Sequence, residues 1–228
     1  MAAGPQREQA AELPPRGTLN ETRWEEVLAV SSKVFEEKGY RGATLQDIAT
    51  RLGLLKGSLY YYIQSKEDLL FEILRRAHQQ GIDFVAEPPD LEGADAPERL
   101  ECLIRRWMVG LEALPSVLKI SLADTRYLKA HRRHEIAALR REIRQVPRRI
   151  IAAGVADGSF RSDVDPDLAT YTMFCILNTT TEWYRPRGPL RWEQVVDWYV
   201  DLVLGGLIHG SARSTAQQLR GGTNQGGV

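Results

Sequence analysis

The sequence predicts an all-α fold of about nine helices, divided into an N-terminal head and a larger C-terminal body. Two observations predict this class: apolar residues recur with helical spacing through most of the chain, and no stretch shows the alternation of a strand. A third divides the chain, because residues 86–97 (AEPPDLEGADAP) are rich in proline and acidic residues. We expect a disordered arm at 1–20, a head at 21–85, a body at 86–212 and a disordered tail at 213–228.

Helical periodicity continues through the head. The first predicted helix begins near Thr22 and ends at Gly39, and Thr44 is suited to cap a second, short helix. After a tight connection, a third short helix covers Lys56–Tyr62, and Ser65 would cap a fourth. Two short helices joined by a tight turn and packed on a first helix form a helix-turn-helix unit, whose second helix enters the DNA major groove.

The body is expected to be helical throughout. Pro97, Pro115 and Pro166 are suited to begin helices, and Gly158 is suited to end one. Pro147 lies inside the longest predicted helix and should kink it. The expected helices cover residues 97–113, 115–129, 131–157, 166–184 and 192–211.

Composition limits the classes of function. Apolar residues make up 43% of the 228 residues, which is typical of a globular chain. The formal net charge is zero, so any argument for nucleic-acid binding must be local. Cys102 and Cys175 are expected to be reduced core residues. Because the N-terminus lacks an apolar signal region and no apolar run reaches membrane-spanning length, we expect a cytoplasmic protein with no membrane contact.

Enzyme chemistry has little support in the sequence. It contains no HExxH or GxSxG motif, no phosphate-binding glycine loop and no paired nucleophile and base. His131 and His134 have a spacing that can bind metal, but no carboxylate or cysteine cluster joins them, so a solvated pair is expected. The sequence predicts a protein that is not an enzyme and needs no cofactor or metal.

The third predicted helix carries residues suited to DNA. Leu59 would hold it on the scaffold, and Gly57 would let the backbone approach DNA closely. Lys56 and Ser58 could donate to phosphates or base edges, and Tyr60–Tyr62 offer hydroxyls and ring faces. The alternative is that the tyrosines belong to a core. Three consecutive helical residues point in different directions, however, so at most one or two can be buried.

Local charge supports the DNA interpretation. Between residues 41 and 66 the only acid is Asp47, against four basic residues: Arg41, Arg51, Lys56 and Lys66. Such a patch suits the phosphate backbone. The Thr44 hydroxyl and the amides at that helix start are expected to form a second phosphate site.

Residues 22–82 resemble the DNA-binding head of the TetR family, with a helix-turn-helix motif at about 44–63. The stretches that carry the resemblance are TLQDIA at 44–49, LG at 52–53, KGSLYYYI at 56–63 and SKEDL at 65–69. The resemblance implies an all-α homodimer that binds a palindromic double-stranded DNA operator and releases it when a small-molecule effector enters the body. It also implies the DNA-contact positions: Thr44, Gln46, Lys56, Gly57, Ser58, Tyr60, Tyr61, Tyr62 and Lys66.

Leu55 departs from the family pattern. The family often has Ser or Thr there as the helix N-cap, and Leu weakens that cap by roughly 1 kcal/mol. This leaves the operator sequence open but not the fold.

The helices predicted at 166–184 and 192–211 are apolar on nearly every side. Such helices need burial on two sides. We expect the protein's own core on one side and a partner subunit on the other, with Gly205 and Gly206 permitting close helix approach. The alternative is one deep monomer core, but two operator half-sites demand two heads, which favours a homodimer.

Two C-terminal segments resemble a TetR branch that regulates fatty-acid and steroid breakdown and responds to acyl-coenzyme A thioesters. They are WYRP at 183–186 with GPL at 188–190, and GSFRSD at 158–163. The resemblance implies an acyl-CoA effector, and the alternative is a drug-responsive repressor of an efflux gene. Arginines along residues 126–149 would suit coenzyme A phosphates. The favoured explanation for these arginines is a solvated helix face, paired with acids in residues 83–101.

An effector pocket is expected among the body helices, although most of its candidate residues should be ordinary core. Asn178 is the best polar candidate, because an amide on an apolar helix needs a partner. Effector binding is expected to change the separation of the heads, so that they no longer fit half-sites one DNA turn apart. The candidate lining residues are Trp107, Met108, Leu111, Tyr127, Phe174, Asn178 and Trp183.

Overall fold

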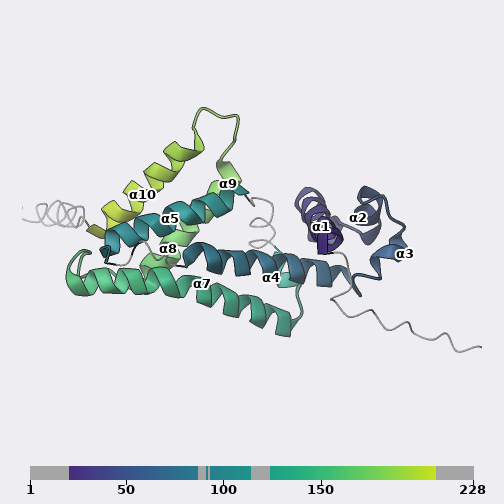
Figure 1. Ribbon diagram of the computed structural model, residues 1–228, viewed down its shortest axis with the longest axis horizontal. Helices are drawn as coiled ribbons and strands as arrows, with labels where there is room; N and C mark the ends of the chain where they lie inside the picture. The colour runs from purple at the N-terminus through teal and green to yellow at the C-terminus, as the bar shows by residue number, and fades with distance from the viewer. Residues whose placement is uncertain (1–20, 87–90, 92, 114–123, 209–228) are drawn as a thin grey trace, which may run out of the picture. The chain divides into compact units, whose positions relative to one another are not determined.

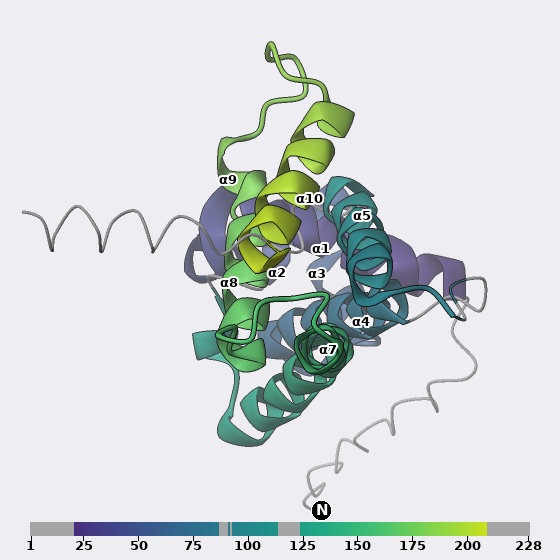
Figure 2. The ribbon, with the colours of Figure 1, turned by 90° about the vertical axis from the view of Figure 1, so that its left-hand side faces the viewer.

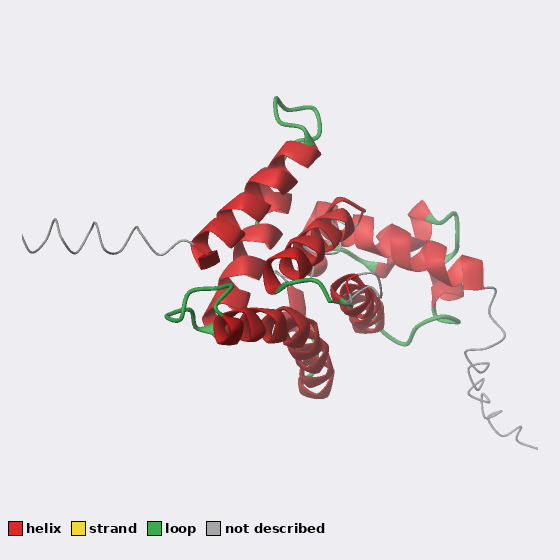
Figure 3. Cartoon of the chain, turned by 60° about the vertical axis from the view of Figure 1, so that its left-hand side comes forward, coloured by secondary structure: helices red, strands yellow, loops and turns green. Residues whose placement is uncertain are grey.

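The computed structural model describes residues 21–86, 91, 93–113 and 124–208, and within these ranges the chain is helices and loops with no strand (Figures 1 and 3). The predicted all-α class and the approximate number of helices are therefore confirmed. The chain forms two compact units, Met1–Glu72 and Ile73–Val228. The arm predicted at 1–20 and the tail at 213–228 lie outside the described residues.

The first unit contains α1 (Glu21–Gly42), α2 (Leu45–Arg51), α3 (Lys56–Leu59) and the start of α4 (Lys66–Val85). The backbone of α1 leaves the helical conformation at Gly39, where φ is 68°, a value that glycine adopts without strain. Gly39 therefore ends the regular part of α1, as the sequence predicts. The core of this unit includes Phe35, Ile48 and Leu59, which are almost completely buried.

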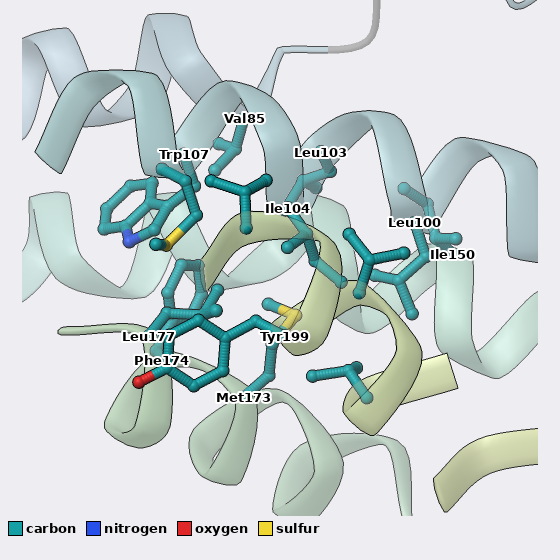
Figure 4. Packing of buried hydrophobic residues seen from close by; sticks show 14 of the residues in the cluster. Val85, Leu100, Leu103, Ile104, Trp107, Ile150, Met173, Phe174, Leu177 and Tyr199 are labelled. Atoms are coloured by element: carbon teal, nitrogen blue, oxygen red, sulfur yellow. The ribbon is translucent and has the colours of Figure 1, made fainter. Parts of the chain in front are cut away.

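The second unit contains the rest of α4 and the helices α5 (Ala96–Ala113), α7 (Ala130–Asp157), α8 (Pro166–Asn178), α9 (Thr180–Trp183) and α10 (Trp192–Ile208). Helix α5 packs against both α7 and α10, and α7 also packs against α8 (Figures 1 and 2). Their inward faces form one apolar core, which Figure 4 shows in part. Helix α7 continues through Pro147, ends at Gly158 with φ of 86°, and bends part-way along its length in Figure 1.

Two helix predictions need correction. The helix predicted at 115–129 lies partly outside the described residues, and where it is described it is a short 3-10 turn, η2 (Thr125–Tyr127), followed by the extended residue Leu128. The side chain of Leu128 is buried, so tertiary packing outweighs helical periodicity here. The helix predicted at 166–184 is interrupted at Thr179, between α8 and α9.

Cys175 is exposed, whereas the sequence predicts a core residue at this position, so this prediction is wrong. The face of α8 that packs into the core is formed by the buried residues Met173, Phe174 and Leu177. Residue 175 lies on the opposite face of the helix. Cys102 is partly buried. No helix among the described residues is both long and apolar enough to cross a membrane.

Candidate DNA-binding surface and effector core

Helix α3 is anchored by one fully buried side chain. Its four residues bury Leu59, and α2 packs against it. The predicted helix over Lys56–Tyr62 is shorter than expected, but hydrogen bonds continue through the next turn, from the Tyr62 and Ile63 amides to the Leu59 carbonyl at 2.9 and 3.1 Å. The segment 56–63 therefore continues as a hydrogen-bonded turn beyond α3, anchored by Leu59.

The outer side of this segment presents large side chains to solvent. Tyr61 is 65% exposed and Tyr60 is 46% exposed, and Lys56 is also exposed. A side chain added at Gly57 would meet nothing within 4 Å, so the space above that backbone is open. These residues form a continuous stretch that another molecule can reach.

Tyr62 differs from its two neighbours. Its ring is partly buried and stacks on Trp24 of α1, with centroids 6.3 Å apart and planes 4° apart. One tyrosine of the three thus belongs to the scaffold, in agreement with the limit that helical geometry sets.

Thr44 is the predicted N-cap of α2. Its hydroxyl accepts from the Asp47 amide at 3.1 Å, and its own amide and hydroxyl donate to the Asp47 carboxylate at 2.9 and 2.8 Å. This reciprocal arrangement is a capping box. The Thr44 amide and hydroxyl, which are expected from the sequence at a phosphate site, therefore both have Asp47 as a partner within the first unit. Gln46 is exposed on the same helix.

The basic patch is smaller than the sequence suggests. Arg51 forms a bidentate ion pair with Glu37 at 2.8 and 2.7 Å, an acid outside the counted stretch. The Lys66 ammonium donates to the carbonyls of Tyr40 and Ala43 at 2.6 and 2.7 Å, where it closes the end of α1. The Lys66 ammonium therefore has hydrogen-bond partners within the first unit.

Two basic side chains of the patch remain available. Across the part of the chain that the structure describes, no hydrogen bond or ion pair engages the side chains of Arg41 and Lys56, which are both exposed. Asp47, the one acid of the stretch, pairs with Lys38 at 2.6 Å. Hydrogen bonds from Lys38 and Thr44 lower the pKa of Asp47 to about 2, so it stays charged at neutral pH.

In the second unit, the structure brings five of the predicted effector residues to α5 and α8. The indole N–H of Trp107 donates to the Asn178 side-chain oxygen at 2.9 Å. The rings of Trp107 and Phe174, both labelled in Figure 4, meet edge to face with their centroids 4.7 Å apart. Met108 and Leu111 are buried on the same helix as Trp107. The expected partner of Asn178 is thus Trp107, and the apolar members of the set belong to the core.

Tyr127 and Trp183 stand apart from this group. Tyr127 is partly buried in η2, where the Arg126 guanidinium lies 5.0 Å from its ring centroid. Trp183 is exposed and contacts the neighbouring Tyr184 ring. Neither residue belongs to the core cluster that contains Trp107 and Phe174.

A buried polar network around His78 was not predicted from the sequence. His78 lies on α4, with Nδ1 at 2.6 Å from the Leu74 carbonyl and Nε2 accepting from Arg140 at 3.0 Å. Arg140 also donates to the Thr125 hydroxyl at 2.9 Å. Burial, with a smaller contribution from Arg140, lowers the pKa of His78 to about 4. A lone histidine on an apolar helix gives no signal of its partner, because the partner comes from a distant helix.

Several arginines of α7 have partners within the unit. Arg144 lies over the Tyr171 ring at 4.9 Å, and Arg148 pairs with Asp167 at 2.7 Å. Arg133 donates to the Leu128 carbonyl. Arg141 and Arg149 are exposed. Arg144 and Arg148 therefore join α7 to α8, and these two partners are not acids of residues 83–101.

Comparison with known proteins identifies the family. Residues 27–73 match the bacterial regulatory proteins of the tetR family, and residues 93–207 match the tetracyclin repressor-like C-terminal domain. The chain belongs to the TetR family. This confirms the resemblance seen in the sequence and makes the chain a DNA-binding transcriptional regulator, in agreement with its interpretation as a protein that is not an enzyme.

Three relatives are informative. The transcriptional repressor KstR2 of Rhodococcus jostii is 34% identical over 80% of this chain and 89% of its own length. The structure of the ketosteroid transcriptional regulator KstR2 of Mycobacterium tuberculosis is 29% identical, with a TM-score of 0.73 over 85% of this chain and 98% of that one. AibR in complex with isovaleryl coenzyme A and operator DNA is 25% identical, with a TM-score of 0.69 over 82% and 98%.

Proposed function

We propose that this TetR-family protein is a homodimeric repressor that reads a palindromic operator with α3 and releases it when a small-molecule effector, best an acyl-CoA thioester, binds the body. The observation that carries the proposal is the outer surface of segment 56–63. Lys56, Tyr60 and Tyr61 are exposed there, while Leu59 locks the segment to the scaffold. A segment that is already folded suits direct reading of base edges, because little ordering is needed on binding.

The proposed DNA contacts fall into two groups. Lys56, Ser58 and the open backbone at Gly57 are placed to approach phosphates or base edges, and Tyr60 and Tyr61 to contact sugars, phosphates and thymine methyl groups. Gln46 on α2 is exposed and adds to this surface, whereas the partly buried Tyr62 is assigned to positioning because its ring stacks on Trp24. Thr44 and Lys66 are assigned to positioning, because their polar groups have partners inside the first unit.

The partner subunit is proposed to cover the outer faces of α8 and α10. Leu168 and Tyr171 on α8, and Trp198 and Leu202 on α10, are large apolar side chains exposed on the single chain. Gly205 adds a position where nothing of this chain lies within 4 Å of a built side chain. Exposed apolar faces of this size on two helices favour a dimer interface.

An acyl-CoA effector is favoured by two observations. AibR, a relative of the same fold, has been crystallised with isovaleryl coenzyme A, and the KstR2 relative is a ketosteroid regulator. In addition, α7 carries the exposed arginines Arg141 and Arg149, whose charge suits the phosphates of coenzyme A. The acyl part would enter beside Trp107 and Phe174, where Asn178 supplies a polar group.

Operator binding is tested first. Sequences selected from random DNA by the full-length protein should share a palindrome, and mobility shifts on them should weaken steeply with salt. Tyr61→Ala should lower operator affinity about 5- to 150-fold, the range that losing one contact of ~1–3 kcal/mol gives, without unfolding the protein. Failure to select any sequence would contradict the reading role of α3.

Dimerisation and effector class need separate measurements. Trp198→Asp should convert the dimer to monomers in sedimentation, whereas Val109→Asp, at an exposed apolar residue of α5, should leave the dimer intact. Thermal-shift measurements should show stabilisation by CoA thioesters of lipid or steroid acids and not by the free acids or by cationic drugs. Stabilisation by the drugs alone would favour the efflux alternative.

A further inference from the structure

Leu55 is the most exposed large apolar side chain among the described residues. It is 82% exposed, whereas Leu54 beside it is partly buried and Leu59 is completely buried. Burying a leucine normally stabilises a fold, so leaving one in water forgoes that gain. The packing of the first unit therefore does not explain the leucine.

Helix capping does not explain it either. Leu55 occupies the N-cap of α3 in an extended conformation, with φ −71° and ψ 143°, and its side chain makes no capping hydrogen bond. Its carbonyl accepts from the Ser58 amide at 2.9 Å, which any residue could provide. Ser, Thr, Asp or Asn at this position would cap the helix and present a polar side chain to water. Leu does neither, so it is unfavourable here both as a cap and as an exposed side chain. Residues that break local rules in this way concentrate at functional sites.

The place of Leu55 in the fold indicates what it meets. It directly precedes Lys56, an exposed cation that has no ion pair within the described residues, and Gly57, whose outer side is open. The first residues of a recognition helix are those that contact base edges. In the major groove, the one apolar group that a base pair presents is the C5 methyl of thymine.

We propose that Leu55 is a specificity-determining residue that selects a thymine in each operator half-site by packing on its C5 methyl group. The proposal rests on the proposed reading of DNA by α3 and adds a base preference to it. Leucine has no donor or acceptor for the other groups on the groove floor, so discrimination comes from apolar contact alone. In this proposal Leu55 selects the base, whereas Lys56 contributes attraction to the phosphate backbone that does not depend on sequence.

The test removes the methyl group and nothing else. After the operator has been selected from random DNA, each thymine in both half-sites is replaced in turn by deoxyuridine, which keeps every hydrogen-bonding group. For one symmetric thymine, the wild-type Kd should rise about fourfold per half-site, the equivalent of ~0.8 kcal/mol for one methyl-sized apolar group. Changing both half-sites should raise it about 16-fold.

Two variants assign the effect to Leu55. Leu55→Ser supplies a cap, so it should fold at least as well as the wild type, and Leu55→Ala removes the branched side chain without adding a polar group. Both should bind the thymine and deoxyuridine operators with equal affinity at that position. Val109→Ala, an equally simple change at an exposed residue far along the chain on α5, should keep the wild-type difference.

The outcomes separate the two levels of the proposal. A selected operator whose deoxyuridine variants bind wild type and Leu55→Ala with the same ratio would overturn the assignment of Leu55 and leave α3 as the reader. Complete loss of specific binding by a folded Leu55→Ser protein would also overturn it, because one methyl contact cannot supply that effect. Only the failure of the wild type to select DNA would remove the proposed function itself.

Discussion

Helices α3 and α5 place their large side chains in opposite ways. In and around α3, Leu59 is buried while Leu55 and Tyr61 extend into solvent. In α5, Trp107 and Met108 point into a packed core. An exposed surface that binds DNA can have its bound conformation in the free protein, because water solvates its side chains when DNA is absent. A close-packed core must give up contacts before it admits a ligand, so effector binding by the body should be linked to its stability.

Truncating Phe174 should have the largest effect. Phe174→Ala removes a buried ring that meets Trp107 and should lower the free energy of unfolding by about 3–5 kcal/mol. Tyr61→Ala should change it by no more than about 0.5 kcal/mol. Denaturant unfolding at one protomer concentration measures both. If Phe174→Ala lowers the free energy of unfolding by less than about 1 kcal/mol, the ring already lines an open cavity. The contrast between the exposed surface around α3 and a close-packed core around α5 would then be wrong.

The pH dependence of stability should come from His78 in the second unit. Folding lowers its pKa from 6.5 to about 4, so the unfolded state binds more protons between these values. The contribution is fully present above pH 6.5 and should fall by about 3 kcal/mol as the pH drops towards 4. When the free energy of unfolding is measured between pH 4 and 6.5, the His78→Gln variant should show much less change with pH than the wild type.

The matched control for His78 is His134→Gln, at an exposed position of α7. It should retain the wild-type pH dependence. If the two variants behave alike, the acid sensitivity does not come from the His78–Arg140 network.

Two glycines allow a smaller and finer comparison. A methyl group at Gly154 of α7 would lie 2.3 Å from the Phe160 ring, so Gly154→Ala should destabilise the fold by about 1–3 kcal/mol. At Gly57 nothing lies within 4 Å, and Gly57→Ala should stabilise α3 by up to about 1 kcal/mol while weakening operator binding. Paired unfolding and mobility-shift titrations check both. Unchanged operator affinity in Gly57→Ala would show that DNA does not approach this backbone closely.

The sequence allowed the order of the helices in the first unit to be predicted. Thr44 and Gly39 begin and end helices through local chemistry, a capping hydrogen bond and a left-handed backbone, and such signals lie within a few residues of each other. The apolar spacing around Leu59 likewise identifies the buried side of α3. Its exposed side then follows by geometry.

Only the tertiary structure decided which of these exposed groups are available. Arg51 and Lys66 look like free cations in the sequence, but Glu37 and two carbonyls of residues 40 and 43 engage them. In the second unit, the hydrogen-bonding partner of Asn178 is Trp107, 71 residues away in the chain, and that of His78 is Arg140, 62 residues away. Helical periodicity reports which side of a helix is apolar, but not which distant helix meets it, because that partner is chosen by the packing of the whole unit.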